Sequence, residues 1–148
     1  MSWLRFSFES RLDELFLVSM IIRQLCQHLR LNEVQAYQIE LCTVEAVTNV
    51  IRHAYHEQPG NEVTVLVSFS DTRIDLEISD RGESMTPHFV EQLRSGSQIL
   101  ESDIGDLMAV PEGGLGLQII RQLMDEKSYS TDGGVNHLKL TRFLNRET

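Results

Sequence analysis

The chain opens with side chains that alternate between polar and apolar. Leu4, Phe6 and Phe8 share one side of this period of two, which predicts a short strand within residues 1–10 because successive side chains of a strand point to opposite faces. From residue 12 the period lengthens to that of an amphipathic helix, with apolar positions at Leu12, Leu15, Phe16, Val18, Ile22, Leu25 and Leu29.

A second helix is predicted from about Glu33 to about Tyr55. Asn32 precedes it as a candidate N-cap, and Gln35 stands three residues later, where a glutamine can complete a capping box. The Pro-Gly pair that follows the helix cannot continue it, so the helix is expected to end there.

Two hairpins are predicted further along the chain. Residues 62–69 and 73–79 alternate between apolar and polar side chains and are joined by a short polar turn, as in an antiparallel strand pair with one face on a core. A second pair is expected near residues 127–130 and 135–143, joined at the sequence Asp-Gly-Gly.

The pattern is weakest between the two hairpins. Residues 81–114 carry glycines, two prolines and only a weak helical pattern near Phe89–Leu93, and a clear helical pattern resumes at Leu115. A stretch this long without clear structure is commonly functional.

This order of elements predicts an α+β fold. We expect a two-layer sandwich in which helices pack on one face of a mixed, mostly antiparallel sheet. No repeat, low-complexity tract or linker divides the sequence, so residues 1–148 are expected to form a single domain.

Charge and composition narrow the functional classes. Thirteen basic against 22 acidic residues give a formal net charge of -9, which argues against general nucleic-acid binding but leaves room for a phosphorylated small molecule. Apolar stretches are too short to span a bilayer, and residues 1–10 lack the design of a secretory signal. We therefore expect a cytoplasmic protein without membrane contact, in which Cys26 and Cys42 are reduced core thiols.

Polar residues cluster on the second predicted helix. Glu45 and Asn49 are four residues apart and so share one face, and Arg52 and His53 extend that face by a turn. A carboxylate beside an amide can activate a hydroxyl group, and an amide oxygen can hold a hard cation. Taken alone, the cluster is more typical of the solvated face of a helix.

Two further clusters contain glycine. Asp80-Arg81-Gly82 directly follows a predicted strand, where a carboxylate can accept from an exocyclic amine, although these residues are also typical of a turn. The segment from Gly113 to Leu117 opens a predicted helix, whose unpaired N–H groups would suit phosphates. Neither a Walker loop nor a Rossmann fingerprint is present in this segment.

Together, in this order, the three clusters resemble the motifs of the Bergerat-type (GHKL) ATPase domain. Within that family the sequence is most similar to the small anti-sigma-factor serine kinases of the RsbW kind. The helical cluster resembles the N box, Asp80 to Gly82 the G1 box and Gly113 to Leu117 the G2 box. The resemblance covers nearly the whole chain.

The resemblance implies a role for each matching residue. Glu45 would be the general base and Asn49 would hold the Mg²⁺ that accompanies ATP. Asp80 would accept from the adenine amine, and Gly82 would let the base lie against the backbone. Residues of the third segment would bind phosphate: Gly113, Gly114, Leu115, Gly116 and Leu117. His53 and Tyr55 are interpreted as structural residues, and Arg52 and Arg121 as solvated charges, although Arg52 could reach the site.

Two features depart from the family pattern. Glu83-Ser84-Met85 stands where a second glycine, or prolines and an aromatic residue, commonly follow the G1 box. The expected ATP lid, residues 88–112, carries one cation, Arg94, against five acidic residues. Repulsion between such a lid and a triphosphate would weaken closure.

The resemblance therefore predicts an ATP-dependent anti-sigma factor. It would phosphorylate a serine of a STAS-type anti-sigma factor antagonist, sequester a sigma factor and form a homodimer. The alternative is a nucleotide-binding docking module without kinase activity, which the acidic lid favours and the intact Glu45 disfavours. A detached ATP domain of a histidine kinase is a third reading, disfavoured by the short lid.

Overall fold

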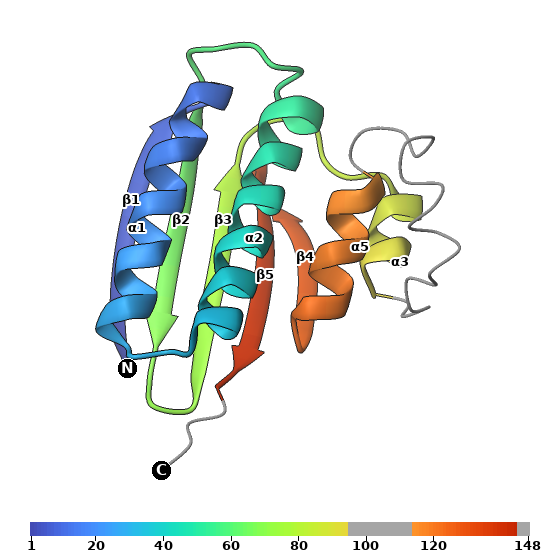
Figure 1. The fold of residues 1–148 in the computed structure, drawn as a ribbon. Coiled ribbons are helices and arrows are strands. Elements are labelled where there is room, and N and C mark those ends of the chain that lie inside the picture. Colours follow the sequence, from blue (N-terminus) through green and yellow to red (C-terminus); the bar gives the residue numbers. More distant parts are fainter. Residues whose placement is uncertain (95–113, 145–148) are drawn as a thin grey trace.

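The computed structural model describes residues 1–94 and 114–144 and contains one sheet covered by helices (Figure 1). Its elements are β1 (Ser2–Glu9), a 3₁₀ turn η1 (Leu12–Glu14), α1 (Leu15–His28), α2 (Glu33–Asn49), a π turn η2 (Val50–Ala54), β2 (Glu62–Phe69), β3 (Arg73–Asp80), α3 (Pro87–Arg94), α5 (Gly114–Leu123), β4 (Glu126–Asp132) and β5 (Val135–Phe143). None of the described helices has the length and apolar character needed to cross a membrane.

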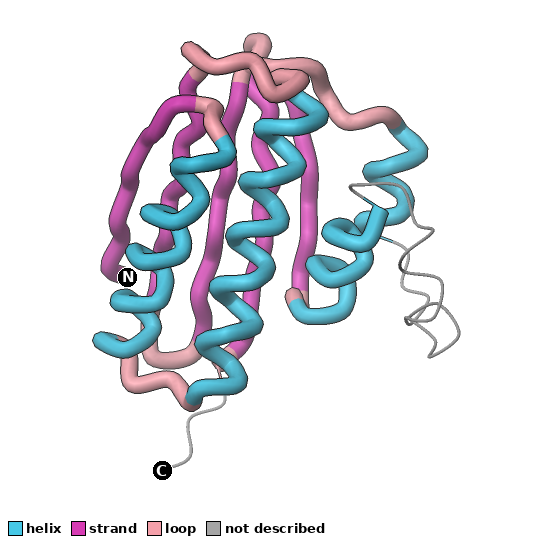
Figure 2. The backbone as a smooth tube through the Cα atoms, turned by 45° about the horizontal axis from the view of Figure 1, so that its top comes forward, coloured by secondary structure: helices cyan, strands magenta, loops and turns pink. Residues whose placement is uncertain are grey.

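The strands form a five-stranded sheet in the order β1-β2-β3-β5-β4, with the helices packed on one of its faces (Figure 2). This confirms the predicted α+β sandwich. Every described pair of neighbouring strands is antiparallel, whereas we expected a mixed sheet. The reason is that two antiparallel helices separate β1 from β2, so the chain enters β2 in the opposite direction to β1.

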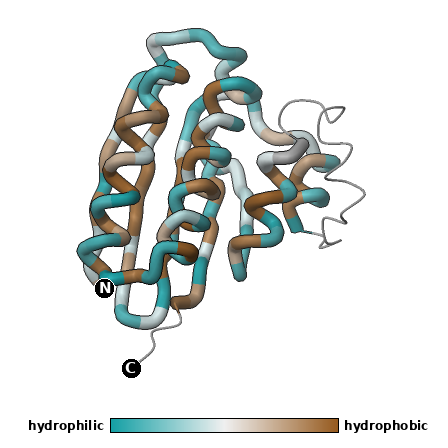
Figure 3. The backbone as a smooth tube through the Cα atoms, in the orientation of Figure 1, coloured by the Kyte–Doolittle hydropathy of each residue, from teal (hydrophilic) through white to brown (hydrophobic). Residues whose placement is uncertain are grey.

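The core lies between the sheet and the helices. Hydrophobic residues, brown in Figure 3, recur along α1, α2 and the central strands, and the buried ones among them form this core. On β3 the buried positions are Ile74, Leu76 and Ile78, each two residues apart, as expected for one face of a strand. The next position in this inward series is Asp80, which is also buried. A carboxylate thus continues an apolar stripe, at the end of the sheet where the site lies.

The predicted start of the second helix is confirmed. The Asn32 side chain accepts a hydrogen bond from the Gln35 backbone N–H at 2.8 Å. The Gln35 side chain does not complete a capping box, because it instead donates to the Phe143 carbonyl, tying α2 to β5. The helix also ends as predicted near Tyr55, but its last turn is the π turn η2, a feature often found at functional sites.

Candidate functional site

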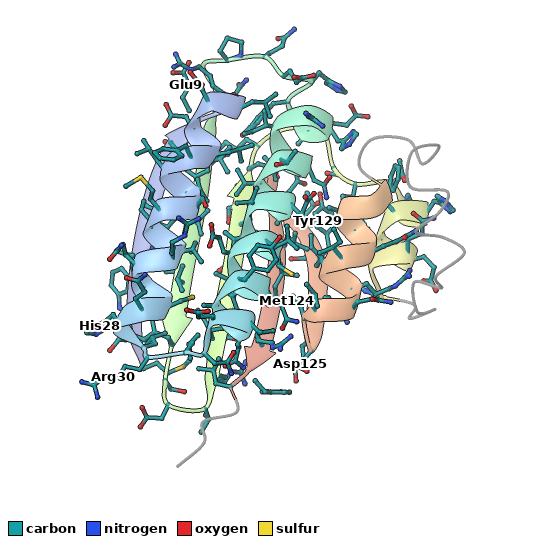
Figure 4. The ribbon with its side chains drawn as sticks, viewed as in Figure 1. Glu9, His28, Arg30, Met124, Asp125 and Tyr129 are labelled. Atoms are coloured by element: carbon teal, nitrogen blue, oxygen red, sulfur yellow. The ribbon has the colours of Figure 1, made fainter. Side chains whose placement is uncertain are left out.

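A cleft of about 190 Å³ lies at the end of α2 and η2, beside the loop that follows β3. Elements far apart in the sequence contribute to it, and Tyr129, labelled in Figure 4, rises from β4 into the space between α2 and α5. The lining residues are Asn49, Val50, His53, Ala54, His56, Asp80, Glu83, Ser84, Met85, Thr86, Phe89, Leu117, Tyr129 and Leu138.

Two predicted residues of α2 meet the start of α5. A β-carbon added to Gly116 would lie 2.6 Å from Glu45 Oε2 and 3.6 Å from Asn49 Nδ2. The first turn of α5 therefore packs directly against the face of α2 that carries the carboxylate and the amide. A helix N-terminus carries unpaired N–H groups and positive dipole charge, so this junction suits an anion.

Glu45 lies half-buried at this junction. Burial raises the pKa of its carboxyl group above the ordinary value of 4.5, and the positive charge of Arg52 partly opposes that shift. A carboxylate with a raised pKa is a better proton acceptor than an ordinary glutamate, as general-base chemistry requires. Arg52 thus acts on the site electrostatically and is not merely a solvated charge.

Asn49 is buried, and its side-chain amide can still donate hydrogen bonds. Within the described part of the chain its Nδ2 atom has no hydrogen-bond partner. A polar atom buried in this way costs about 1–3 kcal/mol, and a phosphate oxygen would supply the acceptor. The oxygen of the same amide is of the kind that Mg²⁺ prefers.

The residues present fit a magnesium ion that arrives with a nucleotide. Among the described residues no three His, Cys, Asp or Glu side chains are grouped to hold a metal ion by themselves. Mg²⁺ in kinases and ATPases is bound by one or two protein groups together with substrate phosphates and waters. Asn49, beside the N-terminus of α5, suits that mode of binding.

Asp80 also lines the cleft. Burial raises the pKa of its carboxyl group above the ordinary value, and hydrogen bonds from Asn136 and from the Gly82 N–H oppose the shift. Both of these bonds end on Oδ1, at 2.8 and 2.9 Å. A carboxylate fixed in this way is a directed acceptor for a ligand in the cleft.

The structure shows a packing requirement for glycine at position 82, in addition to the base contact that the resemblance implied. A β-carbon on Gly82 would lie 2.4 Å from the Ala54 carbonyl oxygen, and the next residue, Glu83, donates its N–H to that same oxygen at 2.9 Å. The loop after β3 is thus pressed against the π turn. Gly82 permits the approach of two backbone segments, and it is not among the residues that line the cleft.

The third cluster lies only partly within the described residues. Gly114, Leu115 and Gly116 form the first turn of α5, and Leu117 lines the cleft, whereas Gly113 lies outside the described residues.

Most of the expected lid, from residue 95 to residue 112, also lies outside the described residues. Its first part, residues 88–94, belongs to α3, where the weak helical pattern was seen. Phe89 of α3 lines the cleft, and Leu93 is buried against the core. Arg121 donates to the Gln92 carbonyl at 3.1 Å and so ties α5 to α3, in contrast to the expected solvated charge.

The structural interpretation of Tyr55 is confirmed, whereas that of His53 is wrong. The Tyr55 hydroxyl donates to the Glu62 carbonyl and accepts from the Arg81 N–H, bridging η2 to both strands of the hairpin. His53 is exposed and lines the cleft beside Asn49.

Asn136 is the functional candidate that sequence reasoning missed. It lies on β5 directly opposite Asp80 in the strand register and is buried. A signal was present, because an asparagine at this position breaks the inward series that continues with Leu138 and Leu140. Asp80 breaks the matching series on β3, and two such breaks on neighbouring strands mark a polar site.

Comparison with known proteins agrees with this geometry. The profile of the family described as "Histidine kinase-like ATPase domain" matches residues 8–142. A solved structure, the SiaB–SiaC complex from Pseudomonas aeruginosa, contains a chain of similar fold, with a TM-score of 0.67 and 13% sequence identity over 95% of this chain and 89% of that one.

Curated relatives include two proteins named serine-protein kinase RsbW. The one from Bacillus licheniformis is 35% identical and the one from Bacillus subtilis (strain 168) is 30% identical, each over 109 residues. These alignments cover 74% of this chain and 65% of the relatives, so the match spans about two thirds of the length of those proteins.

Proposed function

Because the chain belongs to the family of histidine kinase-like ATPase domains, we propose that it binds ATP with Mg²⁺ and transfers the γ-phosphoryl group to a serine of another protein. That protein would be a STAS-type anti-sigma factor antagonist. The relatives named serine-protein kinase RsbW support the transfer to serine.

One observation carries the proposal. Glu45 and Asn49 face the first turn of α5, and Asn49 and Asp80 both line the cleft. Asn49 thus belongs both to the cleft that holds the acceptor and to the junction that holds the general base, as a nucleotide with its adenine in the cleft and its phosphates at α5 requires. Phosphoryl transfer depends mainly on such positioning and on charge neutralisation.

Each residue has a defined task in the reaction. Asp80 accepts a hydrogen bond from the adenine amine, and the N–H groups at the start of α5 bind phosphate oxygens. The ionised Glu45 takes the proton of the serine hydroxyl. At the same time the serine oxygen bonds to the γ-phosphorus, and the bond from this phosphorus to the leaving ADP breaks. Asn49 would hold the Mg²⁺ that accompanies ATP, and this ion would supply charge neutralisation on the phosphates.

We further propose that the chain sequesters a sigma factor in the cytoplasm until the unphosphorylated antagonist relieves it. The solved complex SiaB–SiaC pairs a chain of this fold with a second protein, which supports the use of the fold in protein–protein regulation. A docking module without kinase activity is the alternative, and the buried, raised-pKa environment of Glu45 favours the kinase.

A homodimer is part of the same proposal. β1 is an edge strand that bears Trp3, 66% exposed, and α1 bears Phe16, 72% exposed. A second copy that packs along this edge of the sheet would cover exposed apolar surface. Light scattering should show a dimer that Trp3→Ser with Phe16→Ser converts to a monomer, whereas Val34→Ser, at an exposed site of α2, leaves it intact. A monomeric unsubstituted chain would contradict this part.

Kinase activity is tested by incubating the purified chain with γ-labelled ATP and purified STAS-domain proteins of the same genome. We expect label on serine, with Glu45→Gln lowering the rate at least about 100-fold and leaving ATP affinity within about twofold. Glu33→Gln makes the same chemical change on an exposed position of α2 and should have no effect. ATP binding without transfer to any of these proteins would favour the docking module instead.

A further inference from the structure

We propose that Asn136 is a positioning residue that sets base selectivity, because it holds the Asp80 carboxylate as a fixed acceptor for the exocyclic amine of the base. The inference rests on the proposed function, since it concerns the same nucleotide cleft. Asn136 does not line the cleft and so would act only through Asp80.

The hydrogen bonding of Asn136 is complete. Its Nδ2 atom donates to Asp80 Oδ1 at 2.8 Å and to the Gly82 carbonyl at 3.0 Å. Its Oδ1 atom accepts from the Ser84 hydroxyl at 2.7 Å and from the Thr131 hydroxyl at 2.8 Å. An asparagine amide has two donor hydrogens and two acceptor lone pairs, and all four are used here.

This set of partners also fixes the orientation of the amide. Turning it over would place the amide oxygen against the Asp80 carboxylate and the Gly82 carbonyl, three acceptors without a donor between them. Asn136 is only 1% exposed, so water cannot relieve such a mismatch. The amide nitrogen therefore always faces Asp80. Through its hydrogen bonds the Asn136 side chain connects the end of β3, the loop that follows β3 and the β4–β5 hairpin.

Asp80 needs this support because it is buried. Burial favours its neutral form and raises the pKa, and the Asn136 amide is the first of the contacts that lower it again, followed by the Gly82 N–H and the charge of His137 on β5. Other ionisable groups near Asp80 are Tyr55, directly after η2, and Tyr129 from β4; burial raises the pKa of both hydroxyl groups, and the charge of Asp80 raises it further. A protonated Asp80 would carry an O–H donor besides its acceptor lone pairs and would select less strongly for an amine.

Loss of Asn136 should therefore remove selectivity for the amine before it removes binding. A general structural defect would weaken all nucleotides alike. The informative pair of ligands is ATP and the triphosphate of unsubstituted purine riboside, which differs from ATP only by lacking the 6-amine. Phosphate contacts at α5 are common to both ligands and cancel in the ratio of affinities.

The test is calorimetric titration of the full chain with each ligand in the presence of Mg²⁺. A hydrogen bond to a charged acceptor should make the unsubstituted protein prefer ATP by about tenfold or more. Asn136→Ala should lower that preference to under about threefold and leave affinity for the amine-free ligand within about twofold. Thr131→Val removes a bond from the same amide on the side away from Asp80, at an exposed residue, and should keep most of the preference.

The double substitution Asp80→Asn with Asn136→Ala distinguishes action through Asp80 from an independent effect. Asp80→Asn alone should abolish the preference, and adding Asn136→Ala should change it no further. If Asn136→Ala does not fold, Asn136→Thr keeps a hydroxyl donor at this position and should give an intermediate preference. A full tenfold preference in a folded Asn136 variant would overturn the inference, whereas absence of ATP binding by the unsubstituted protein would overturn the proposed function itself.

Discussion

The carboxylate of Glu45 and the α-carbon of Gly116 lie so close that a methyl group on Gly116 would come within 2.6 Å of Glu45 Oε2. This contact joins the general-base candidate on α2 to the proposed phosphate-binding end of α5. It explains why the third cluster needs a glycine here although the residue has ordinary helical geometry. The space is required by the Glu45 carboxylate and not by the local backbone.

Gly116→Ala should therefore impair chemistry more than folding. The group displaced is the end of a flexible side chain, so the free energy of unfolding should change by less than about 1 kcal/mol, since alanine also favours the helix. Phosphoryl transfer should fall about tenfold or more because Glu45 moves. Urea unfolding and the transfer rate measure the two effects. Gln118→Ala on the same helix is the control, and an unchanged rate with Gly116→Ala would contradict the assigned position of Glu45.

Gly82→Ala should impair folding more than chemistry. Its β-carbon would lie 2.4 Å from the Ala54 carbonyl oxygen, which is backbone and cannot turn aside. We expect a loss of about 2–3 kcal/mol of unfolding free energy, as for an overpacked site. Gly60 has open space around it, and Gly60→Ala should cost about 1–2 kcal/mol, from its positive φ alone. Equal losses at the two positions in urea titrations would show that the contact with η2 is unimportant.

The pH dependence of transfer should reflect the raised pKa of Glu45. Transfer needs the ionised form, so the rate should fall as pH is lowered through a pKa above the ordinary 4.5. The free energy of unfolding should change in the opposite direction to the rate. Burial disfavours the charged form of Glu45, so the ionised carboxylate lowers stability at neutral pH. Glu45→Gln should unfold at higher urea concentration than the unsubstituted protein at pH 7, and this difference should vanish near pH 4. An acid limb at or below 4.5 would contradict the burial of Glu45.

Both cysteines should resist thiol reagents while the protein is folded. Burial raises the pKa of Cys26 to about 11 and that of Cys42 to about 12, so at pH 8 the thiolate form is roughly 100-fold scarcer for Cys26, and roughly 1000-fold scarcer for Cys42, than for a free cysteine. Labelling with a chromogenic disulfide should be slow in buffer and fast in urea. Rapid labelling of either thiol in buffer would show that the interface between α1 and α2 opens readily.

The sequence predicted most of the fold because period and capping are local. Asn32, the hairpins and the helix that carries Glu45 and Asn49 could be recognised from neighbouring residues alone. The sheet was expected to be mixed, since nothing local to a strand shows in which direction its neighbour runs. Its antiparallel pairing follows from the pair of helices between β1 and β2.

The site was harder to predict where it depends on register between distant strands. Asn136 could be linked to Asp80 only once β5 was placed beside β3. The packing of Gly82 could not be predicted for the same reason, because its neighbour Ala54 belongs to the end of a helix that comes much earlier in the chain. His53 was interpreted as structural because the π turn that turns it toward the cleft has no sequence signal.

The binding of ATP with Mg²⁺ through Asn49 is the claim on which the rest depends. Calorimetric titration of the full chain with ATP, with and without Mg²⁺, tests it directly, together with the same titrations of Asn49→Ala. We expect binding that is strengthened by Mg²⁺ in the unsubstituted protein and a loss of that strengthening in the variant, whose fold is checked by its circular dichroism. A folded protein that does not bind ATP, or an Asn49→Ala variant with unchanged Mg²⁺ dependence, would contradict the account.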